Sequence, residues 1–230
     1  MKKDILKTTY LYGIIPNIKK KYNDFNLFKN DYTLPSVILK KVKVWFGKPK
    51  DIDQNCLLGI KCWYINYITC EKKESEYHGS ELKSDNIESK ELEIKDNDYF
   101  NKINFGFDSF ITHFKISTKK GKYIEFGEII DDSEKILRIN MEDNMIVFFS
   151  GYFSSLGIRA IRIKYINRKD FIYYRIVEIL RLKHIMKNNE NIKNYYQNEI
   201  NYNKLDITMK YIFHTSLLPD TILSTILKYL

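Results

Sequence analysis

The stretch with the clearest capacity for chemistry is a short loop of glycine, serine and tyrosine between two apolar runs. It reads GYFSSLGIRAIR over residues 151–162 and ends with two arginines. An arginine side chain offers five N–H donors and no acceptor, so it pairs well with a carboxylate or a phosphate. We therefore treat this loop as a candidate binding site, formed by Gly151, Tyr152, Ser154, Ser155, Gly157 and Arg159.

Both arginines also have a simpler interpretation. For Arg159 the alternative is an ordinary solvated residue at the end of a loop. Arg162 alternates with isoleucines, a pattern that predicts an outward-facing surface position on a strand. The residue types alone do not decide between a site and a surface for Arg159.

No motif in the sequence defines an enzyme. There is no nucleophile elbow, no phosphate-binding loop and no dinucleotide-binding glycine motif. The histidines lack the spacing of a metal site, and they are His78, His113, His184 and His214. The cysteines are odd in number and include no CxxC pair, which favours reduced, partly buried thiols; they are Cys56, Cys62 and Cys70. We expect a non-catalytic protein without a cofactor or a metal.

Composition bounds the protein class. Of the 230 residues 44% are hydrophobic and 29% are charged, which is enough apolar material for a packed core. The net charge of +9 admits a nucleic acid, an anionic membrane or an acidic protein as a partner. The lysines are dispersed, apart from the run 19–21, so we favour a lysine-rich background over nucleic-acid binding.

The sequence carries no targeting or membrane signal that we recognise. The N-terminal residues lack the apolar segment of a signal peptide. No run approaches the roughly 18 apolar residues of a membrane span. These patterns predict a cytoplasmic or otherwise intracellular protein without a transmembrane segment.

The elements that must position the loop are strands. From residue 36 to residue 168, short runs rich in isoleucine, valine, phenylalanine and tyrosine alternate with turn residues. Alternation of apolar and charged residues over 38–45 is typical of a half-buried strand, and the run 111–126 is typical of a hairpin. The polar segment 71–91 is expected to be a loop. Several short strands at this spacing predict a mainly β domain, either a sandwich, a barrel or a prism.

Two flanking segments complete a three-part organisation of the chain. Residues 1–35 are expected to form a tail or a short helix packed on the β domain of residues 36–168. Residues 169–230 read as α-helical, with Asp170 as the N-cap of the first helix. A last helix opens near Pro219 and has one apolar face for docking, formed by Ile222, Leu223, Ile226, Leu227 and Leu230.

Several motifs in the β region resemble those of the jacalin-type lectin domains. The stretch 96–127 resembles the middle of such domains, and MIVFFSGYFSSLGIRAIRIKY at 145–165 resembles their closing motif. HGS at 78–80 resembles the HGG turn of the family, and the likeness covers roughly residues 36–168. The resemblance implies a jacalin-like β-prism, in which three four-stranded antiparallel sheets surround a pseudo-threefold axis.

The resemblance also implies where a sugar would bind, and here the chain departs from the family pattern. One family loop is a Gly-Gly loop, whose nearest candidate is WFGKPKDID at 45–53 with Gly47 and Asp51. Whether this stretch matches that loop or the hairpin after it stays open. The second loop ends in an Asp that accepts hydrogen bonds from sugar hydroxyls, and Arg159 stands at that position. The resemblance therefore implies a degenerate sugar site, better suited to an anionic group.

Four hypotheses for function follow, in order of preference. The first is a non-catalytic, lectin-like module that binds another protein or belongs to a larger assembly. The second is a carbohydrate-binding lectin of the jacalin type with a site rearranged toward anionic glycans. The third is a charge-driven binder of nucleic acid or anionic lipid. The fourth is an adaptor, because LPDTILSTILKYL at 218–230 faintly resembles the first helix of an F-box.

Overall fold

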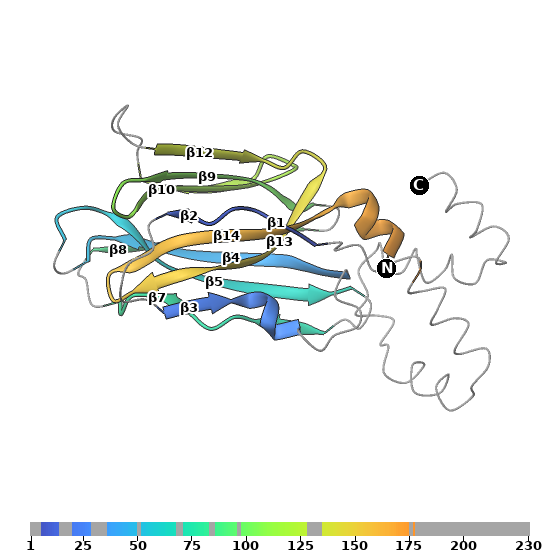
Figure 1. Ribbon diagram of the computed structural model, residues 1–230, viewed down its shortest axis with the longest axis horizontal. Coiled ribbons are helices and arrows are strands. Elements are labelled where there is room, and N and C mark those ends of the chain that lie inside the picture. Colours follow the sequence, from blue (N-terminus) through green and yellow to red (C-terminus); the bar gives the residue numbers. More distant parts are fainter. Residues whose placement is uncertain are drawn as a thin grey trace, which may run out of the picture.

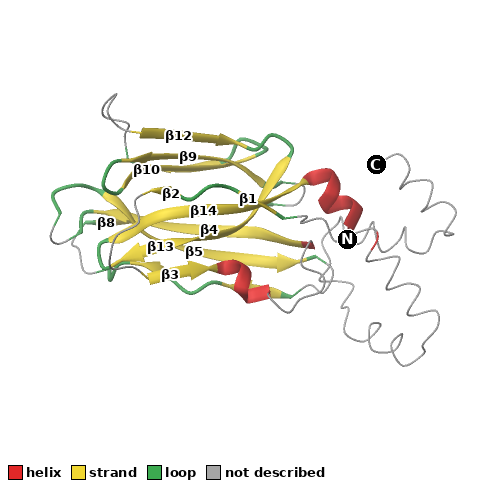
Figure 2. Cartoon of the chain, in the orientation of Figure 1, coloured by secondary structure: helices red, strands yellow, loops and turns green. Residues whose placement is uncertain are grey.

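The computed structural model describes residues 6–13, 20–28, 36–49, 52–67, 71–82, 86–95, 98–127, 135–174 and 177. Strands account for most of the described part of the chain (Figure 2). They form three antiparallel sheets around one hydrophobic core, as in a jacalin-like β-prism, so the predicted fold is confirmed.

Each sheet is built from its own set of strands (Figure 1). Sheet A has the order β1-β14-β13-β3, with β2 also on β14; its strands are β1 (Lys7–Thr8), β2 (Tyr12–Gly13), β3 (Lys20–Asn23), β13 (Asn144–Ser154) and β14 (Gly157–Asn167). Sheet B has the order β6-β5-β4-β8, with β7 also on β5; its strands are β4 (Val37–Gly47), β5 (Cys56–Asn66), β6 (Lys72–Glu74), β7 (His78–Gly79) and β8 (Ile87–Glu93). Sheet C has the order β11-β10-β9-β12; its strands are β9 (Phe100–Phe107), β10 (Ile111–Thr118), β11 (Tyr123–Phe126) and β12 (Lys135–Asn140). Sheets A and B have five strands rather than the four that the resemblance implies, because β1 with β2, and β6 with β7, lie as short strands along one partner.

Period-two alternation explains why these segments are strands. In β4 the valines at 42 and 44 are fully buried, whereas the lysines at 41 and 43 are only partly covered. The inward residues of all three sheets meet in one core. Aromatic rings fill its centre, where Phe148 lies 5.2 Å from Tyr64 and 5.7 Å from Phe28 between ring centroids.

Two predictions about the polar segments are wrong. Residues 1–35 were expected to be a tail or a short helix, but their described part contributes β1, β2 and β3 to sheet A and a 3-10 helix at Asp24–Phe28. The segment 71–91 was expected to be a loop, but it holds β6, β7 and the start of β8. All of these strands except β2 carry mostly exposed or half-buried polar residues, so apolar alternation could not reveal them.

A helix follows β14, but its N-cap differs from the prediction. Residues 168–174 are helical, and the backbone N–H of Lys169 donates to Asn167 Oδ1 over 2.9 Å. Asn167 therefore caps the helix, and Asp170 lies within its first turn. Residues 178–230 lie outside the described residues, so the apolar face of the last helix and the F-box-like stretch stay predictions, as do the domain boundaries.

A buried polar cluster ties the N-terminal segment to sheet B. Asp24, in the 3-10 helix, is only 2% exposed. It accepts a hydrogen bond from the Tyr64 hydroxyl on β5, and its Oδ1 lies 2.7 Å from His78 Nε2 on β7. Tyr22 of β3 stacks on the His78 ring with centroids 4.4 Å apart. These contacts hold the β3 end of sheet A against sheet B.

Candidate functional site

Hairpins from all three sheets meet at one end of the prism, on the left in Figure 1. The β13–β14 hairpin of sheet A contacts the other two. The thiol of Cys56, at the start of β5, lies 3.7 Å from the Leu156 carbonyl oxygen. The Arg159 guanidinium lies 4.0 Å from the ring centroid of Phe110, in the turn between β9 and β10. We call this region the hairpin end.

Backbone geometry accounts for the glycines and one serine of the β13–β14 hairpin. Gly157 has a φ of 130°, and an added Cβ would lie 2.6 Å from the Leu57 carbonyl oxygen. Gly151 is buried within β13, where a Cβ would collide with the Ala160 carbonyl oxygen. The Leu156 backbone N–H donates to Ser154 Oγ over 3.2 Å and closes the turn. These three residues therefore have a structural role: the two glycines allow the backbone conformation of the hairpin, and the Ser154 hydroxyl stabilises its turn.

Two other residues of the predicted site stand closer to solvent. Ser155 is exposed at the tip of the hairpin, and Tyr152 is half-buried on β13. Arg162 is exposed on β14, in agreement with the outward position that alternation predicts. Of the residues predicted to form the site, four therefore have side chains that are at least partly exposed: Tyr152, Ser154, Ser155 and Arg159.

Arg159 is held in place rather than freely solvated. Its side chain is half-buried over Phe110, and its Nε atom is buried without a hydrogen-bond partner. Burial lowers the pKa of the Arg159 guanidinium, and the nearby Cys56 thiol counters this in part. A guanidinium held over an aromatic ring is preorganised, so an anionic group could pair with it at little conformational cost.

The second predicted loop belongs to the neighbouring hairpin. Gly47 ends β4 and pairs with Cys56 on β5 and with Ile87 on β8. The stretch 45–53 is thus part of the β4–β5 hairpin of sheet B. Asp51 lies outside the described residues.

Two short strands lie along the two edges of the β13–β14 hairpin, β2 beside β14 and β3 beside β13. Gly13 of β2 pairs with Ala160, and Lys20 of β3 pairs with Phe153. Alternation did not reveal either short strand, so the sequence offered no clear signal for this arrangement. Residues 14–19 between them lie outside the described residues.

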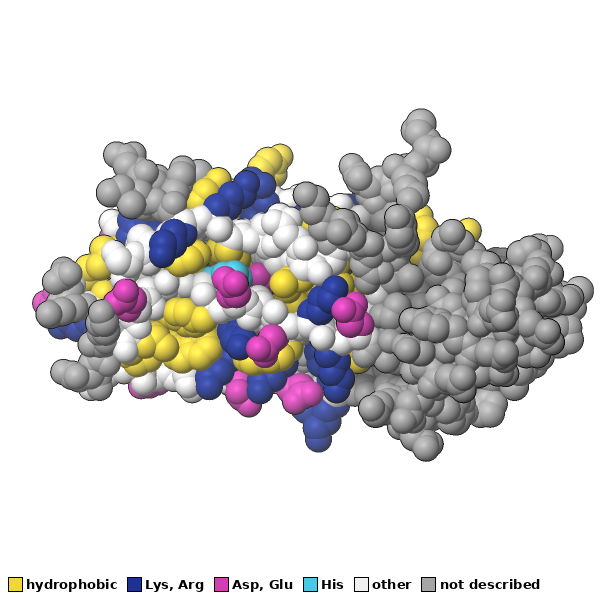
Figure 3. Space-filling view, turned by 90° about the horizontal axis from the view of Figure 1, so that it is seen from below, with side chains coloured by type: hydrophobic (Ala, Val, Ile, Leu, Met, Phe, Trp, Pro, Cys, Tyr) yellow, Lys and Arg dark blue, Asp and Glu magenta, His cyan; other side chains and the backbone are white. Residues whose placement is uncertain are grey.

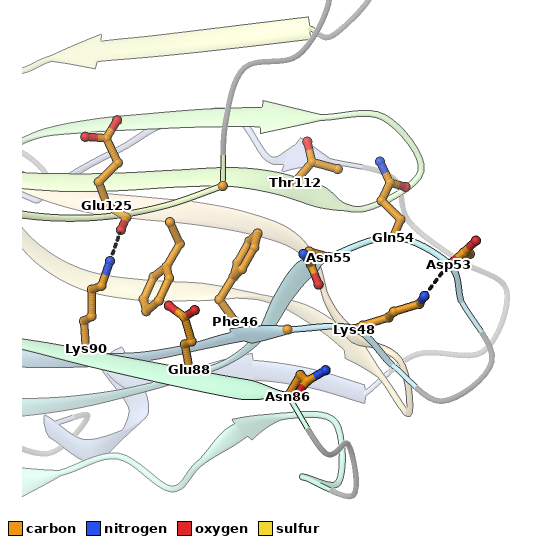
Figure 4. Close-up of a pocket in the computed structure, with 13 residues that line it drawn as sticks. Phe46, Lys48, Asp53, Gln54, Asn55, Asn86, Glu88, Lys90, Thr112 and Glu125 are labelled. Carbon is orange, nitrogen blue, oxygen red and sulfur yellow. Dashed lines mark hydrogen bonds and ion pairs between the residues drawn. The ribbon is translucent and has the colours of Figure 1, made fainter.

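Sequence reasoning missed a groove at the corner between sheets B and C (Figure 4). Its volume is about 830 Å³, and it is open to solvent beside the β4–β5 hairpin. We call it the corner groove. It is lined by residues from three separate stretches of sequence, among them Phe46, Asn55, Asn86, Glu88, Thr112 and Phe126. Of the predicted site residues that the structure describes, Gly47 is the one that lies on its wall.

The two cysteines and two histidines that the structure describes are buried or half-buried. Burial raises the pKa of the Cys56 thiol to about 12, so it stays protonated at neutral pH. His113 is buried, and its Nε2 lies 3.0 Å from Glu125 Oε1, which Lys115 also binds through Oε2 at 2.7 Å. Within the described ranges, no group of three or more acidic, histidine or cysteine side chains could hold a metal ion.

The fold and the hairpin end define a β-prism of the lectin type. The family model of the jacalin-like lectin domain matches residues 38–164, more than half of the sequence. The chain belongs to the jacalin-like lectin domain family.

Solved structures of plant lectins share this fold at low sequence identity. Wild-type Malaysian banana lectin is 14% identical, with a TM-score of 0.52, over 70% of this chain and 98% of that chain. Artocarpin, complexed with methyl α-mannose, is 14% identical, with a TM-score of 0.52, over 71% of this chain and 99% of that chain. A mannose-binding jacalin-related lectin from Ananas comosus is 12% identical, with a TM-score of 0.50, over 70% and 98%. No curated protein sequence matches the chain.

Two further observations concern a possible membrane span and the distribution of charge on the surface. Within its described part, no helix has the length and the apolar character to cross a membrane. On the face seen from below, lysines and arginines are interspersed with acidic side chains (Figure 3). Among the described residues of that face, the two signs of charge are therefore mixed rather than gathered into the broad basic patch typical of nucleic-acid binding.

Proposed function

We propose that this chain is a non-catalytic, lectin-like binding module whose hairpin end binds an acidic surface of another protein. The observation that carries the proposal is the state of Arg159. Its guanidinium is stacked on Phe110, and its buried Nε has no partner. A carboxylate that approaches the terminal nitrogens would form a charge-assisted pair there.

The composition of the β13–β14 loop supports an anionic partner over a neutral sugar. Residues 151–159 contain no aspartate or glutamate, so the loop has no carboxylate to accept hydrogen bonds from sugar hydroxyls. Arginine has donors only and cannot take that role. The net charge of +9 further favours an acidic partner by steering its approach.

Carbohydrate binding is the second candidate, and family membership favours it. The structural neighbours include a mannose-binding lectin and a lectin complexed with methyl α-mannose. At the hairpin end this candidate takes the form of an acidic glycan, since Arg159 pairs with a sugar carboxylate or sulfate as readily as with a protein carboxylate.

Affinity capture and a glycan array, run on the same variants, separate the two candidates. The variants are Arg159→Asp and, as a matched control, Arg162→Asp, which reverses the same charge on an exposed residue of the same strand. We expect a protein partner that is lost with Arg159→Asp and kept with Arg162→Asp, with affinity that falls as salt rises. Acidic glycans bound through Arg159 would support the second candidate. A partner or glycan that binds both variants equally would refute a role for Arg159.

A further inference from the structure

The outer face of sheet C, the uppermost sheet in Figure 1, is basic. Its strands send Ile103 and Ile116 into the core, so the residues between the apolar positions face outward. In one outward row across the strands, Ser117 pairs with both Lys102 and Tyr123. We call this outward surface, together with the adjoining β10–β11 turn, the basic face. Its basic side chains are Lys102, Lys115, Lys119, Lys120, Lys122 and Arg138.

Little negative charge offsets these cations. Glu125 is the one acidic residue in the four strands of sheet C, and it already binds Lys115 and His113. Asp98 is 6% exposed, and its Oδ1 accepts the backbone N–H of Lys120 in the turn over 3.1 Å. Four exposed cations form no side-chain hydrogen bond or ion pair within the described part of the chain: Lys102, Lys119, Lys122 and Arg138.

The outward lysines of sheet B are arranged differently. Lys41 pairs with Glu91 over 3.0 Å, and Lys61 pairs with Glu74 over 3.2 Å. The cations of the basic face are spread over residues 102–138 of the sequence, so no dense block of charge is visible there, and the fold gathers them on one surface. This contrast indicates that the basic face is a local feature rather than the average of a lysine-rich composition.

An exposed aromatic ring lies within the basic face. Tyr123 is 56% exposed, and Lys115 Nζ lies 4.3 Å from its ring centroid. Sites for single-stranded nucleic acids combine the same two components, because aromatic rings stack on bases while cations follow the phosphates. RNA-binding domains also stack bases on aromatic side chains of a four-stranded sheet, and sheet C has four strands.

We propose that the basic face binds a single-stranded nucleic acid, with a base stacked on Tyr123 and phosphates along the four unpaired cations. This inference goes beyond the proposed function and does not rest on it, because Arg159 lies on sheet A. Phosphate contacts and stacking carry little sequence information, so binding has no strong base preference. An anionic membrane or an acidic protein would also be attracted by the cations, but only a base needs the exposed ring for stacking.

The test measures the fluorescence anisotropy of labelled oligo(U) and oligo(dT), each of about twelve nucleotides, with the purified full-length chain at about 50–300 mM salt. Lys119→Ala/Lys122→Ala removes two unpaired cations of the turn. Its matched control is Lys7→Ala/Lys20→Ala, which removes the same charge from exposed positions on sheet A. Tyr123→Ala removes the ring, and Tyr123→Phe keeps it. Phosphatidylserine vesicles and a polyglutamate peptide are measured in parallel, and thermal unfolding verifies that every variant folds.

We expect both oligonucleotides to bind and to be released by salt. Four phosphate contacts at about 0.7 each predict a slope of roughly −3 for log K against log salt concentration. Lys119→Ala/Lys122→Ala should reduce the slope to roughly −1.4, and the sheet A control should leave it unchanged. Tyr123→Ala should weaken binding about tenfold without a change of slope, and Tyr123→Phe should bind like the wild type.

Three results would overturn the proposal. Equal losses from the two lysine double variants would show attraction by net charge alone. Binding that Tyr123→Ala leaves unchanged would remove the stacked base. A folded wild type that binds neither oligonucleotide at about 100 μM protein and low salt would end the proposal, and vesicles or peptide bound in their place would assign the basic face to another polyanion. None of these results concerns the acidic partner at Arg159, which the Arg159→Asp capture judges separately.

Discussion

Replacing Asp24 tests the reasoning about how the N-terminal segment is held on the prism. Asp24 is 2% exposed and receives two hydrogen bonds, one from Tyr64 on β5 and one from His78 on β7, 54 residues away in sequence. Asp24→Asn keeps the size of the side chain but removes its charge. One oxygen remains to accept from one partner, and the new amide N–H₂ faces the other.

The expected loss follows from the contacts. A hydrogen bond to a charged group contributes about 1.5–3 kcal/mol, so Asp24→Asn should lower the free energy of unfolding by about that amount. Asp24→Ala leaves two donors without an acceptor and should cost about 2–6 kcal/mol, since each buried donor left unsatisfied costs about 1–3 kcal/mol. For a chain of this size, each kcal/mol lowers Tm by about 2–4 °C.

Urea unfolding followed by circular dichroism measures both effects. The control is Asp108→Asn, the same change at an exposed aspartate of the β9–β10 turn, and it should be neutral. The double variant Asp24→Asn/His78→Gln should lose less than the sum of its single variants, since they remove one shared contact. An Asp24→Asn variant within about 0.5 kcal/mol of the wild type would refute the view that this cluster stabilises the fold.

Three further predictions concern other buried or paired groups. Thr112→Val removes a buried hydroxyl without a partner and should raise the free energy of unfolding by about 1 kcal/mol in urea; a loss of that size would contradict the assignment. Burial alone would raise the pKa of Glu125, but hydrogen bonds from Lys115 and His113 outweigh it and hold the pKa below its usual value. The stability that Glu125 supplies is therefore present above its unfolded-state pKa of about 4.3 and lost as pH falls through its lower folded-state value, so Glu125→Gln should be less stable than the wild type at pH 7 and equally stable near pH 3. In a Cys70→Ser background, a disulfide reagent at pH 8 should leave the native protein unmodified, because Cys56 and Cys62 are buried with raised pKa values; rapid labelling would show that one of them is open.

The main strands could be predicted because the alternation of apolar and polar residues in their sequences indicates which face of each strand is buried. In β4, and in the β10–β11 hairpin, apolar residues alternate with polar ones, and the period of two is enough to place a strand. β3 gave no such signal. Its residues Lys20–Asn23 include one buried side chain, Tyr22, and the strand exists because the edge of β13 offers it hydrogen bonds. The tertiary partner, rather than the local pattern, determines such a strand.

The candidate site, too, could be predicted from the sequence only in part. The β13–β14 loop and Arg159 were predicted from residue types within one short stretch, but the stacking on Phe110 joins residues of different sheets. The corner groove was missed because its walls come from residues 46–55, 86–90 and 112–127, and nothing in those stretches shows that they meet. Only the packing of sheet B against sheet C brings Phe46 into contact with Phe126.

The pairing of β1, β2 and β3 with β13 and β14 has a consequence for how the protein is made. Sheets B and C each consist of strands that follow one another in sequence, so they can form as the chain leaves the ribosome. Sheet A must wait, because Thr9 binds Ile163, 154 residues later, and such distant contacts form slowly. Until β13 emerges for β3, and β14 for β1 and β2, these three strands lack their partners, and this interval is when chaperones would be needed most.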